Sequence, residues 1–159
     1  MNSLQLSALI NASPDVRRYF QGVYALDSLP SVGVRNSTYI CNLDNSHEEG
    51  SHWIALYVPS TKDAPVEYFD SYGLAAPKYL EHGLLSESNV RYYLYNKRPI
   101  QQLLSATCGQ FCLYFIMKRP QVQSMDIVLS IFKDCSLLYN DLLVNRLVES
   151  YFAVDLDID

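Results

Sequence analysis

The stretch CGQFCLYFIMKR, residues 108–119, is apolar on nearly every side and stops directly before Pro120. A run of this length and pattern predicts a buried helix, and the helix ends there because the residue before a proline is disfavoured from helical conformation. We therefore expect the central helix of the domain to begin at Cys108. A thiol at a helix N-terminus lies beside free backbone amides and the positive end of the helix dipole, which favour the thiolate.

Four extended segments precede this helix, and each is rich in branched and aromatic residues. They are TYICNLD (38–44), SHWIALYV (51–58), VEYFD (66–70) and VRYYLYN (90–96). Such segments, bounded by turn residues, predict neighbouring strands of one sheet. Further upstream, Ser13 and Pro14 stand in the order of a helix cap and a first helical position, which predicts a short helix and then a loop ending near Pro30.

Two helical patterns close the chain, at 124–135 and 140–152. Ser124 is a suitable N-cap for the first of them, and either Asn140 or Asp141 for the second. The order of helix, strands and then helices predicts an α+β domain with a mostly antiparallel, mixed sheet packed on the helix that starts at Cys108. With 159 residues and no sign of a linker, we expect a single domain over 1–159.

The composition excludes several classes of function. A net charge of -5 and scattered basic residues argue against nonspecific binding of nucleic acid. No apolar run is long enough to span a membrane, and the first residues lack the pattern of a secretion signal, so we expect a soluble intracellular protein. In that setting the four cysteines are expected to be free thiols. Their spacing does not suggest zinc, and we expect neither a metal nor a cofactor.

Three residues have the chemistry of a nucleophilic site. Cys108 is the candidate nucleophile, His52 opens an apolar strand directly before Trp53, and Asp70 ends a strand beside a turn. If the strands of His52 and Asp70 are neighbours, the carboxylate accepts a hydrogen bond from one ring nitrogen and fixes the tautomer that faces the thiol. Each residue alone is more often structural, as a buried cysteine, a strand-edge histidine or a turn aspartate.

Other polar residues are weaker or supporting candidates. Gln101 and Gln102 lie in the loop before Cys108, where a side-chain amide can donate to an oxyanion together with a backbone amide. Cys112 lies one turn further along the apolar helix, where burial raises a thiol pKa, so we assign it to the core. The remaining histidines and acids stand in loop-like stretches, namely His47, His82, Asp27 and Asp44.

Taken together, four local motifs resemble the adenovirus protease (adenain) family and its relatives in Polinton/Maverick-type transposons and large DNA viruses. These motifs are His52-Trp53, the run FDSYG at 69–73, Gln101 with Ser105, and Cys108-Gly109. The proteases of ubiquitin-like modifiers are more distant kin. The resemblance covers roughly residues 20 to 118 and implies a papain-like cysteine protease fold of the adenain type. The spacing of Gln101 from Cys108 matches the adenovirus pattern, whereas the modifier proteases place their glutamine at the position of Gln102.

The resemblance implies a thiol endopeptidase in which Cys108 attacks a peptide carbonyl, His52 transfers the proton and Asp70 orients His52. It implies virion maturation, with cleavage of viral or transposon capsid and core precursors and a tendency to cut after glycine. The alternatives are a deconjugating protease for ubiquitin or a similar modifier, and an acyltransferase that uses the same triad.

The expected partner is a protein substrate, either a precursor or a modifier conjugate, and a peptide activator fits the family as well. This chain is acidic where the DNA-stimulated member of the family has a basic surface, which argues against DNA as a cofactor. The expected location is the cytoplasm or nucleus of a host cell, with packaging in virions.

Overall fold

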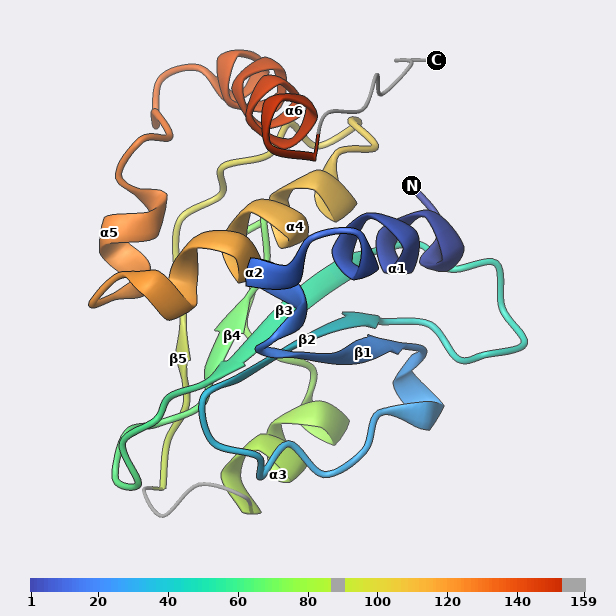
Figure 1. Cartoon of the computed structure of the whole chain (residues 1–159), viewed down its shortest axis with the longest axis vertical. Helices are drawn as coiled ribbons and strands as arrows, with labels where there is room; N and C mark the ends of the chain where they lie inside the picture. Colours follow the sequence, from blue (N-terminus) through green and yellow to red (C-terminus); the bar gives the residue numbers. More distant parts are fainter. Residues whose placement is uncertain (87–90, 153–159) are drawn as a thin grey trace.

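The computed structural model describes residues 1–86 and 91–152 (Figure 1). Five strands form one mixed sheet whose spatial order follows the chain. They are β1 (Phe20–Tyr24), β2 (Ser37–Asn42), β3 (Trp53–Val58), β4 (Glu67–Phe69) and β5 (Leu94–Tyr95). The three central strands are antiparallel to one another, whereas β1 runs parallel to β2 and β5 runs parallel to β4.

The sheet is mixed, as predicted, but it is less antiparallel than expected, because the pairings at both edges are parallel. Parallel neighbours need a crossover connection rather than a tight turn. Residues 25–36, which include the 3-10 helix η1 (Leu26–Ser28), make this connection between β1 and β2. The helix α3 (Lys78–Ser86), which the sequence analysis did not predict, lies on the connection between β4 and β5.

Helices cover both faces of the sheet. The helices α1 (Ser3–Asn11), α2 (Pro14–Arg17) and α4 (Cys108–Lys118) lie on one face, and α3 lies on the other (Figure 1). All six residues of β2 are consequently buried. Alternate residues of β2 and β3 point into two cores, because successive side chains of a strand face opposite sides. Ile40 and Ala55 belong to the core beneath α4, and Tyr39, Cys41, Ile54 and Leu56 to the core above α3.

The predicted central helix is confirmed as α4. Its residues 111–117 are all buried. The ring of Phe115 stacks on Phe69 of β4 with centroids 4.7 Å apart. Just after the helix, Arg119 makes a two-pronged ion pair with Glu67, with Nε–Oε2 and Nη2–Oε1 distances of 2.7 and 2.8 Å. These contacts fix the helix on the sheet and so determine where Cys108 lies.

The observed bounds of the other N-terminal and edge elements differ from the predicted bounds by several residues. Pro14 begins α2 after Ser13 as expected, but the helix ends at Arg17 and the chain then enters β1, which was predicted as helix and loop. The helix α1 was not predicted. Of the predicted strand 90–96 only Leu94 and Tyr95 form β5, and Val90 lies outside the described residues.

The C-terminal part also differs in its boundaries. Ser124 caps α5 (Met125–Leu129) by accepting a hydrogen bond from the amide of Ile127, but the helix is shorter than the predicted 124–135. The 3-10 helix η2 (Arg119–Gln121) precedes it. The helix α6 (Leu137–Phe152) begins three residues before Asn140, so the prediction that Asn140 or Asp141 caps it is wrong. Both residues are buried inside the helix and instead bond the loop that leads to Cys108.

Candidate active site

Cys108 is the first residue of α4, as the sequence predicts. Its side chain is half-buried and makes hydrogen bonds with His52 and with the backbone amides of Trp53 and Gly109. Burial alone would raise the pKa of the thiol, but these hydrogen bonds and the positive charge of His52 hold the pKa below its usual value. The thiolate is therefore stabilised where the helix begins.

The sheet register brings His52 next to the turn that contains Asp70. Ala55 of β3 pairs with Phe69 of β4, and the strands are antiparallel. Extending this register past the strand ends places His52 opposite Tyr72 and diagonal to Asp70. In agreement, His52 Nε2 lies 2.7 Å from Asp70 Oδ1, and the His52 ring stacks on Tyr72 with centroids 4.7 Å apart.

The carboxylate of Asp70 leaves the other ring nitrogen of His52, Nδ1, for the thiol. Burial of the imidazole would lower its pKa, but the hydrogen bonds to Asp70 and Cys108 outweigh burial and raise the pKa of His52 to about 9. An imidazole with this pKa is a cation near neutral pH. The geometry therefore favours a thiolate–imidazolium pair held in place by a buried carboxylate.

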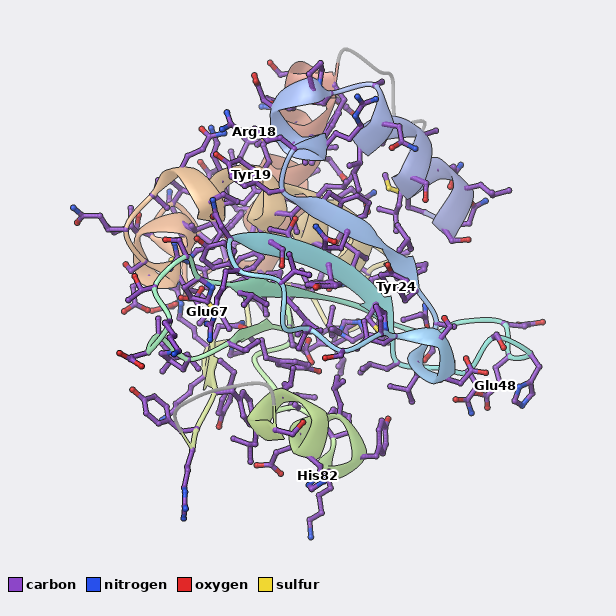
Figure 2. The ribbon with its side chains drawn as sticks, turned by 60° about the horizontal axis from the view of Figure 1, so that its bottom comes forward. Arg18, Tyr19, Tyr24, Glu48, Glu67 and His82 are labelled. Atoms are coloured by element: carbon purple, nitrogen blue, oxygen red, sulfur yellow. The ribbon has the colours of Figure 1, made fainter. Side chains whose placement is uncertain are left out.

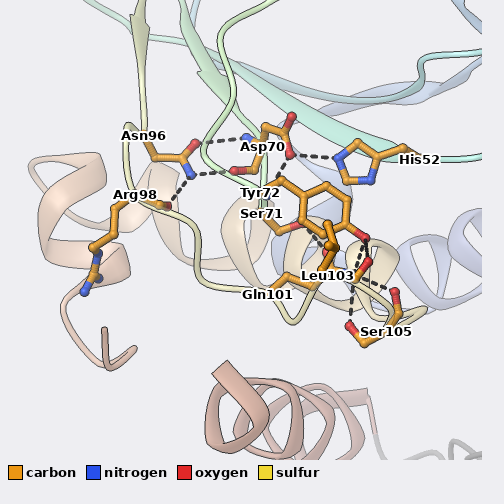
Figure 3. A network of polar contacts seen from close by, with 9 residues as sticks. All are labelled: His52, Asp70, Ser71, Tyr72, Asn96, Arg98, Gln101, Leu103 and Ser105. Carbon is orange, nitrogen blue, oxygen red and sulfur yellow. Dashed lines mark hydrogen bonds and ion pairs between the residues drawn. The ribbon is translucent and has the colours of Figure 1, made fainter. Parts of the chain in front are cut away.

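The position of Asp70 is fixed by backbone groups and by Asn96 (Figure 3). Asp70 is 1% exposed, and its Oδ1 also accepts a hydrogen bond from the amide of Tyr72 at 2.8 Å. Gly73 closes this turn with φ +71, and a Cβ there would lie 2.6 Å from the carbonyl carbon of Arg98. Glycine is required at this position because both the backbone angle and the space exclude a side chain.

Of the two predicted glutamines, the structure places only Gln101 in this network. Gln101 is 1% exposed, its Oε1 accepts from Ser71 Oγ at 2.5 Å, and its Nε2 donates to the carbonyl of Ser105 at 2.9 Å. The same nitrogen lies 3.4 Å from the hydroxyl of Tyr72. The side chain of Gln102 is exposed, and its backbone amide donates to Asp141.

Several residues that support this site were not among the predicted ones. Asn96 at the end of β5 bonds the backbone of Asp70, and Asp141 of α6 accepts from Thr107 Oγ1 at 3.0 Å next to the nucleophile. No local pattern identifies either of them, because each contacts a segment at least 26 residues away in sequence. Tyr72 belongs to the FDSYG run, but its stacking on His52 follows only from the register.

The remaining candidates lie elsewhere. Cys112 is buried in the core, and burial raises the pKa of its thiol well above the usual value. Cys41 is also in a core, with its pKa raised to about 12 by burial. His47 and His82 are exposed on other segments, and Asp27 accepts hydrogen bonds from Ser46.

No group of three or more His, Cys, Asp or Glu side chains in 1–86 and 91–152 is arranged to hold a metal ion. None of the helices in these ranges combines the length and the apolar character needed to cross a membrane.

The chain is similar to viral proteases in sequence and in fold. No protein-family model matches the chain. A protein of Acanthamoeba polyphaga mimivirus that bears the name thiol protease R355 is 28% identical over 112 residues, which are 65% of this chain and 36% of that protein. The chain thus spans little more than a third of the length of this curated relative.

Among solved structures, the crystal structure of ASFV pS273R protease matches with a TM-score of 0.52 and 20% identity, over 78% of this chain and 58% of that chain. The selenomethionine form of the same protease matches with a TM-score of 0.44 and 24% identity, over 65% and 42% of the two chains. The chain therefore shares an α+β fold with a viral protease and is similar in sequence to a viral thiol protease.

Proposed function

We propose that this chain is a cysteine endopeptidase with Cys108 as nucleophile, His52 as general base and acid, and Asp70 as the group that orients His52. The observation that supports it is one continuous line of contacts, from Asp70 Oδ1 to His52 Nε2 at 2.7 Å and from His52 to the thiol at the start of α4. The similarity to a mimivirus thiol protease points to the same chemistry.

In this proposal the thiolate of Cys108 attacks a substrate carbonyl carbon, and the carbonyl oxygen becomes an oxyanion. The C–N bond then breaks, and His52 gives its proton to the leaving amine. A thioester remains on Cys108. Water attacks this thioester after His52 removes one of its protons, which releases the carboxylic acid and restores the thiolate.

We assign Gln101 rather than Gln102 as the side-chain donor to the oxyanion, together with the backbone amide of Cys108. Gln101 is buried and connected through the Tyr72 hydroxyl to the ring that stacks on His52. Its Nε2 donates to Ser105 in the free protein, so binding of substrate exchanges one of these bonds for the oxyanion. The exposed side chain of Gln102 has no comparable anchoring.

The proposed substrates are polypeptides, specifically capsid or core precursors of a virus or transposon that are cut after glycine. We test this with two sets of substrates. Cleavage of short glycine-containing peptides would indicate a processing protease. Cleavage only of fusions to a folded ubiquitin-like modifier would instead indicate a deconjugating protease and refute this proposal. In both sets the Cys108→Ala variant must lose the activity and Cys112→Ala must retain it, and activity in Cys108→Ala would refute the assigned nucleophile.

A further inference from the structure

All hydrogen bonds that the described residues make with the carboxylate of Asp141 come from the loop 101–107, directly before the nucleophile. Asp141 lies on α6 and is 5% exposed, and its Oδ1 is 3.0 Å from Thr107 Oγ1 and 3.5 Å from the amide nitrogen of Gln102. The hydroxyl of Ser105 bonds the same carboxylate. The second oxygen, Oδ2, is buried and has no partner within the described residues. Because burial of a carboxylate is costly, its presence here indicates a role in that loop.

Thr107, the residue before the nucleophile, does not cap the helix that it precedes. Threonine is a favoured N-cap because its hydroxyl accepts a hydrogen bond from an amide of the first turn. Thr107 instead has φ −94 and ψ 6, which is not the extended conformation of a usual cap, and its hydroxyl makes no cap bond. The hydroxyl donates to Asp141. Asp141 therefore holds the peptide unit between Thr107 and Cys108, whose N–H is the proposed backbone donor to the oxyanion.

Two hydroxyls connect Asp141 to the side chain of Gln101, whose bonds to Ser105 are drawn in Figure 3. Gln101 Nε2 is 3.1 Å from Ser105 Oγ, which is 2.9 Å from Thr107 Oγ1. A hydroxyl can donate or accept, whereas a carboxylate only accepts. Because the Thr107 proton is directed to Asp141, Thr107 accepts from Ser105, and Ser105 accepts from Gln101. The Ser105 carbonyl accepts from the same nitrogen at 2.9 Å, so both bonds keep Nε2 rather than Oε1 on the side of Ser105 and Tyr72.

We propose that Asp141 is a positioning residue for the oxyanion site, which fixes the Cys108 amide through Thr107 and the Gln101 side chain through the two hydroxyls. Both donors are then in place before a substrate binds. This rests on the proposed protease function and adds to it a residue that does not touch the reacting atoms. Preorganised donors act on the charge that develops in the transition state, so the expected effect is on kcat rather than on KM.

The test compares two reagents that react with the same thiol. Iodoacetamide is attacked at a saturated carbon and forms no oxyanion, whereas a peptide aldehyde ending in glycinal adds the thiol at its carbonyl carbon and places its oxygen in the oxyanion site. Protection of Cys108 from iodoacetamide measures the affinity of the full chain for the aldehyde without any turnover. For Asp141→Ala we expect this affinity and the kcat of peptide hydrolysis to fall by about tenfold or more. KM and the iodoacetamide rate should change by less than about threefold.

Further variants test the connection itself. Thr107→Val removes the hydroxyl at nearly constant volume and should weaken aldehyde binding as Asp141→Ala does, so the test remains decisive if Asp141→Ala does not fold. The double variant should show no further loss, because both changes break the same connection. Thr107→Ser keeps the hydroxyl and Asp141→Asn keeps an oxygen acceptor, so each should bind the aldehyde within about threefold of the unchanged chain.

Two controls separate positioning from other consequences of these substitutions. Asn145→Ala truncates another buried side chain one turn further along α6 and controls for a loss of stability. Glu48→Gln removes a carboxylate from the exposed loop between β2 and β3, which Figure 2 shows projecting past the Tyr24 end of the sheet, and controls for net charge. Neither control should weaken aldehyde binding.

Aldehyde affinity that is unchanged in both Asp141→Ala and Thr107→Val overturns the inference. A fall in the iodoacetamide rate that matches the loss of affinity also overturns it, because the whole site would then be disturbed. The same holds if iodoacetamide labels Cys108 selectively but the unchanged chain does not bind the aldehyde, since no oxyanion site would exist. Weaker aldehyde binding in the variants, with no peptide hydrolysis by the unchanged chain, supports the positioning role and counts against the proposed protease function.

Discussion

The side-chain amide of Asn96 forms hydrogen bonds with both the backbone amide and the backbone carbonyl of Asp70. Asn96 Oδ1 accepts a hydrogen bond from the amide of Asp70 at 2.9 Å, and Asn96 Nδ2 donates to the carbonyl of Asp70. Asn96 is 6% exposed, so water does not replace these bonds easily. Asn96, directly after β5, thereby holds the residue that orients His52.

We predict that Asn96→Ala lowers kcat by about tenfold or more, because loss of two buried hydrogen bonds allows the carboxylate of Asp70 to move away from His52. The free energy of unfolding should fall by about 1–3 kcal/mol, since the buried amide of Asp70 is left unpaired, whereas its carbonyl still accepts from the amide of Gly73. Peptide hydrolysis and chemical denaturation measure the two effects. If Asn96→Ala loses this stability but keeps its kcat, Asn96 has only a structural role and does not position Asp70 for catalysis.

The pKa values of the pair predict the pH dependence of hydrolysis. His52 must be protonated to donate to the leaving amine, and its pKa is raised to about 9, so kcat/KM should fall as pH rises through about 9. Alkylation of Cys108 needs only the thiolate and should not fall over this range. Hydrolysis that keeps rising above pH 9 would contradict the assigned role of His52.

The same shift predicts a change in stability. Because the folded protein binds the His52 proton more tightly than the unfolded chain, the contribution of this proton is fully present below the unfolded pKa of about 6.5. It is lost as pH rises through about 9. The His52→Ala variant should lose this part of the pH dependence in denaturation curves measured between pH 6 and pH 10, whereas an unaltered dependence would speak against the raised pKa.

The ion pair between Glu67 and Arg119 predicts a large stability effect away from the chemistry. Both side chains are buried, and Arg119 also lies over the ring of Tyr57 at 4.4 Å. Glu67→Gln leaves the guanidinium without its counter-charge and should reduce the free energy of unfolding by about 3–5 kcal/mol. Asp134→Asn breaks the exposed pair with Arg98 and should cost less than about 1 kcal/mol. Equal melting temperatures of the two variants would be inconsistent with this account.

Replacing each glutamine in turn by alanine distinguishes Gln101 from Gln102 as the oxyanion donor. Gln101→Ala should lower kcat by about a hundredfold with little change in KM, as expected for loss of a donor that acts in the transition state. Gln102→Ala should leave kcat within about twofold, because the effect of an exposed side chain is small. The reverse result would move the assignment to Gln102.

The parts of the fold that were predictable from sequence have strong local patterns. The apolar run from Cys108 predicts α4 within a residue at each end, and the branched and aromatic runs predict β2, β3 and β4. The strand β1 has a glycine in its centre and follows a helix-like segment, so no local signal separates it from a loop. Its strand conformation comes from parallel pairing with β2, which is a tertiary interaction.

The helix α6 shows how a cap can be misassigned. Asn140 and Asp141 are good N-cap residue types, but both are buried and bond Ile100, Lys133, Gln102 and Thr107 from within the helix. Their polar groups bond the loop before the nucleophile and, through Lys133, the segment that precedes α6. Sequence cannot distinguish these uses, because the partners of Asp141 are more than 30 residues away.

The residues of the candidate site were predictable for a different reason. His52, Asp70 and Cys108 each stand at the end of a regular element, where a side chain can leave the core, and each belongs to a short motif. What the motifs omit is the supporting layer of Asn96, Asp141 and the stacked ring of Tyr72. These contacts depend on register and packing, which one sequence does not specify.

The most direct test of the central claim is the rate at which iodoacetamide modifies each cysteine near pH 7, followed by mass spectrometry of the peptides. Cys135 is exposed and serves as the internal reference. An activated pair predicts that Cys108 reacts at least about tenfold faster than Cys135, although Cys108 is half-buried and Cys135 is exposed. The His52→Ala variant should lose this difference in rate. Modification of Cys108 at or below the rate of Cys135, or a fast rate that persists in His52→Ala, would contradict the thiolate–imidazolium pair.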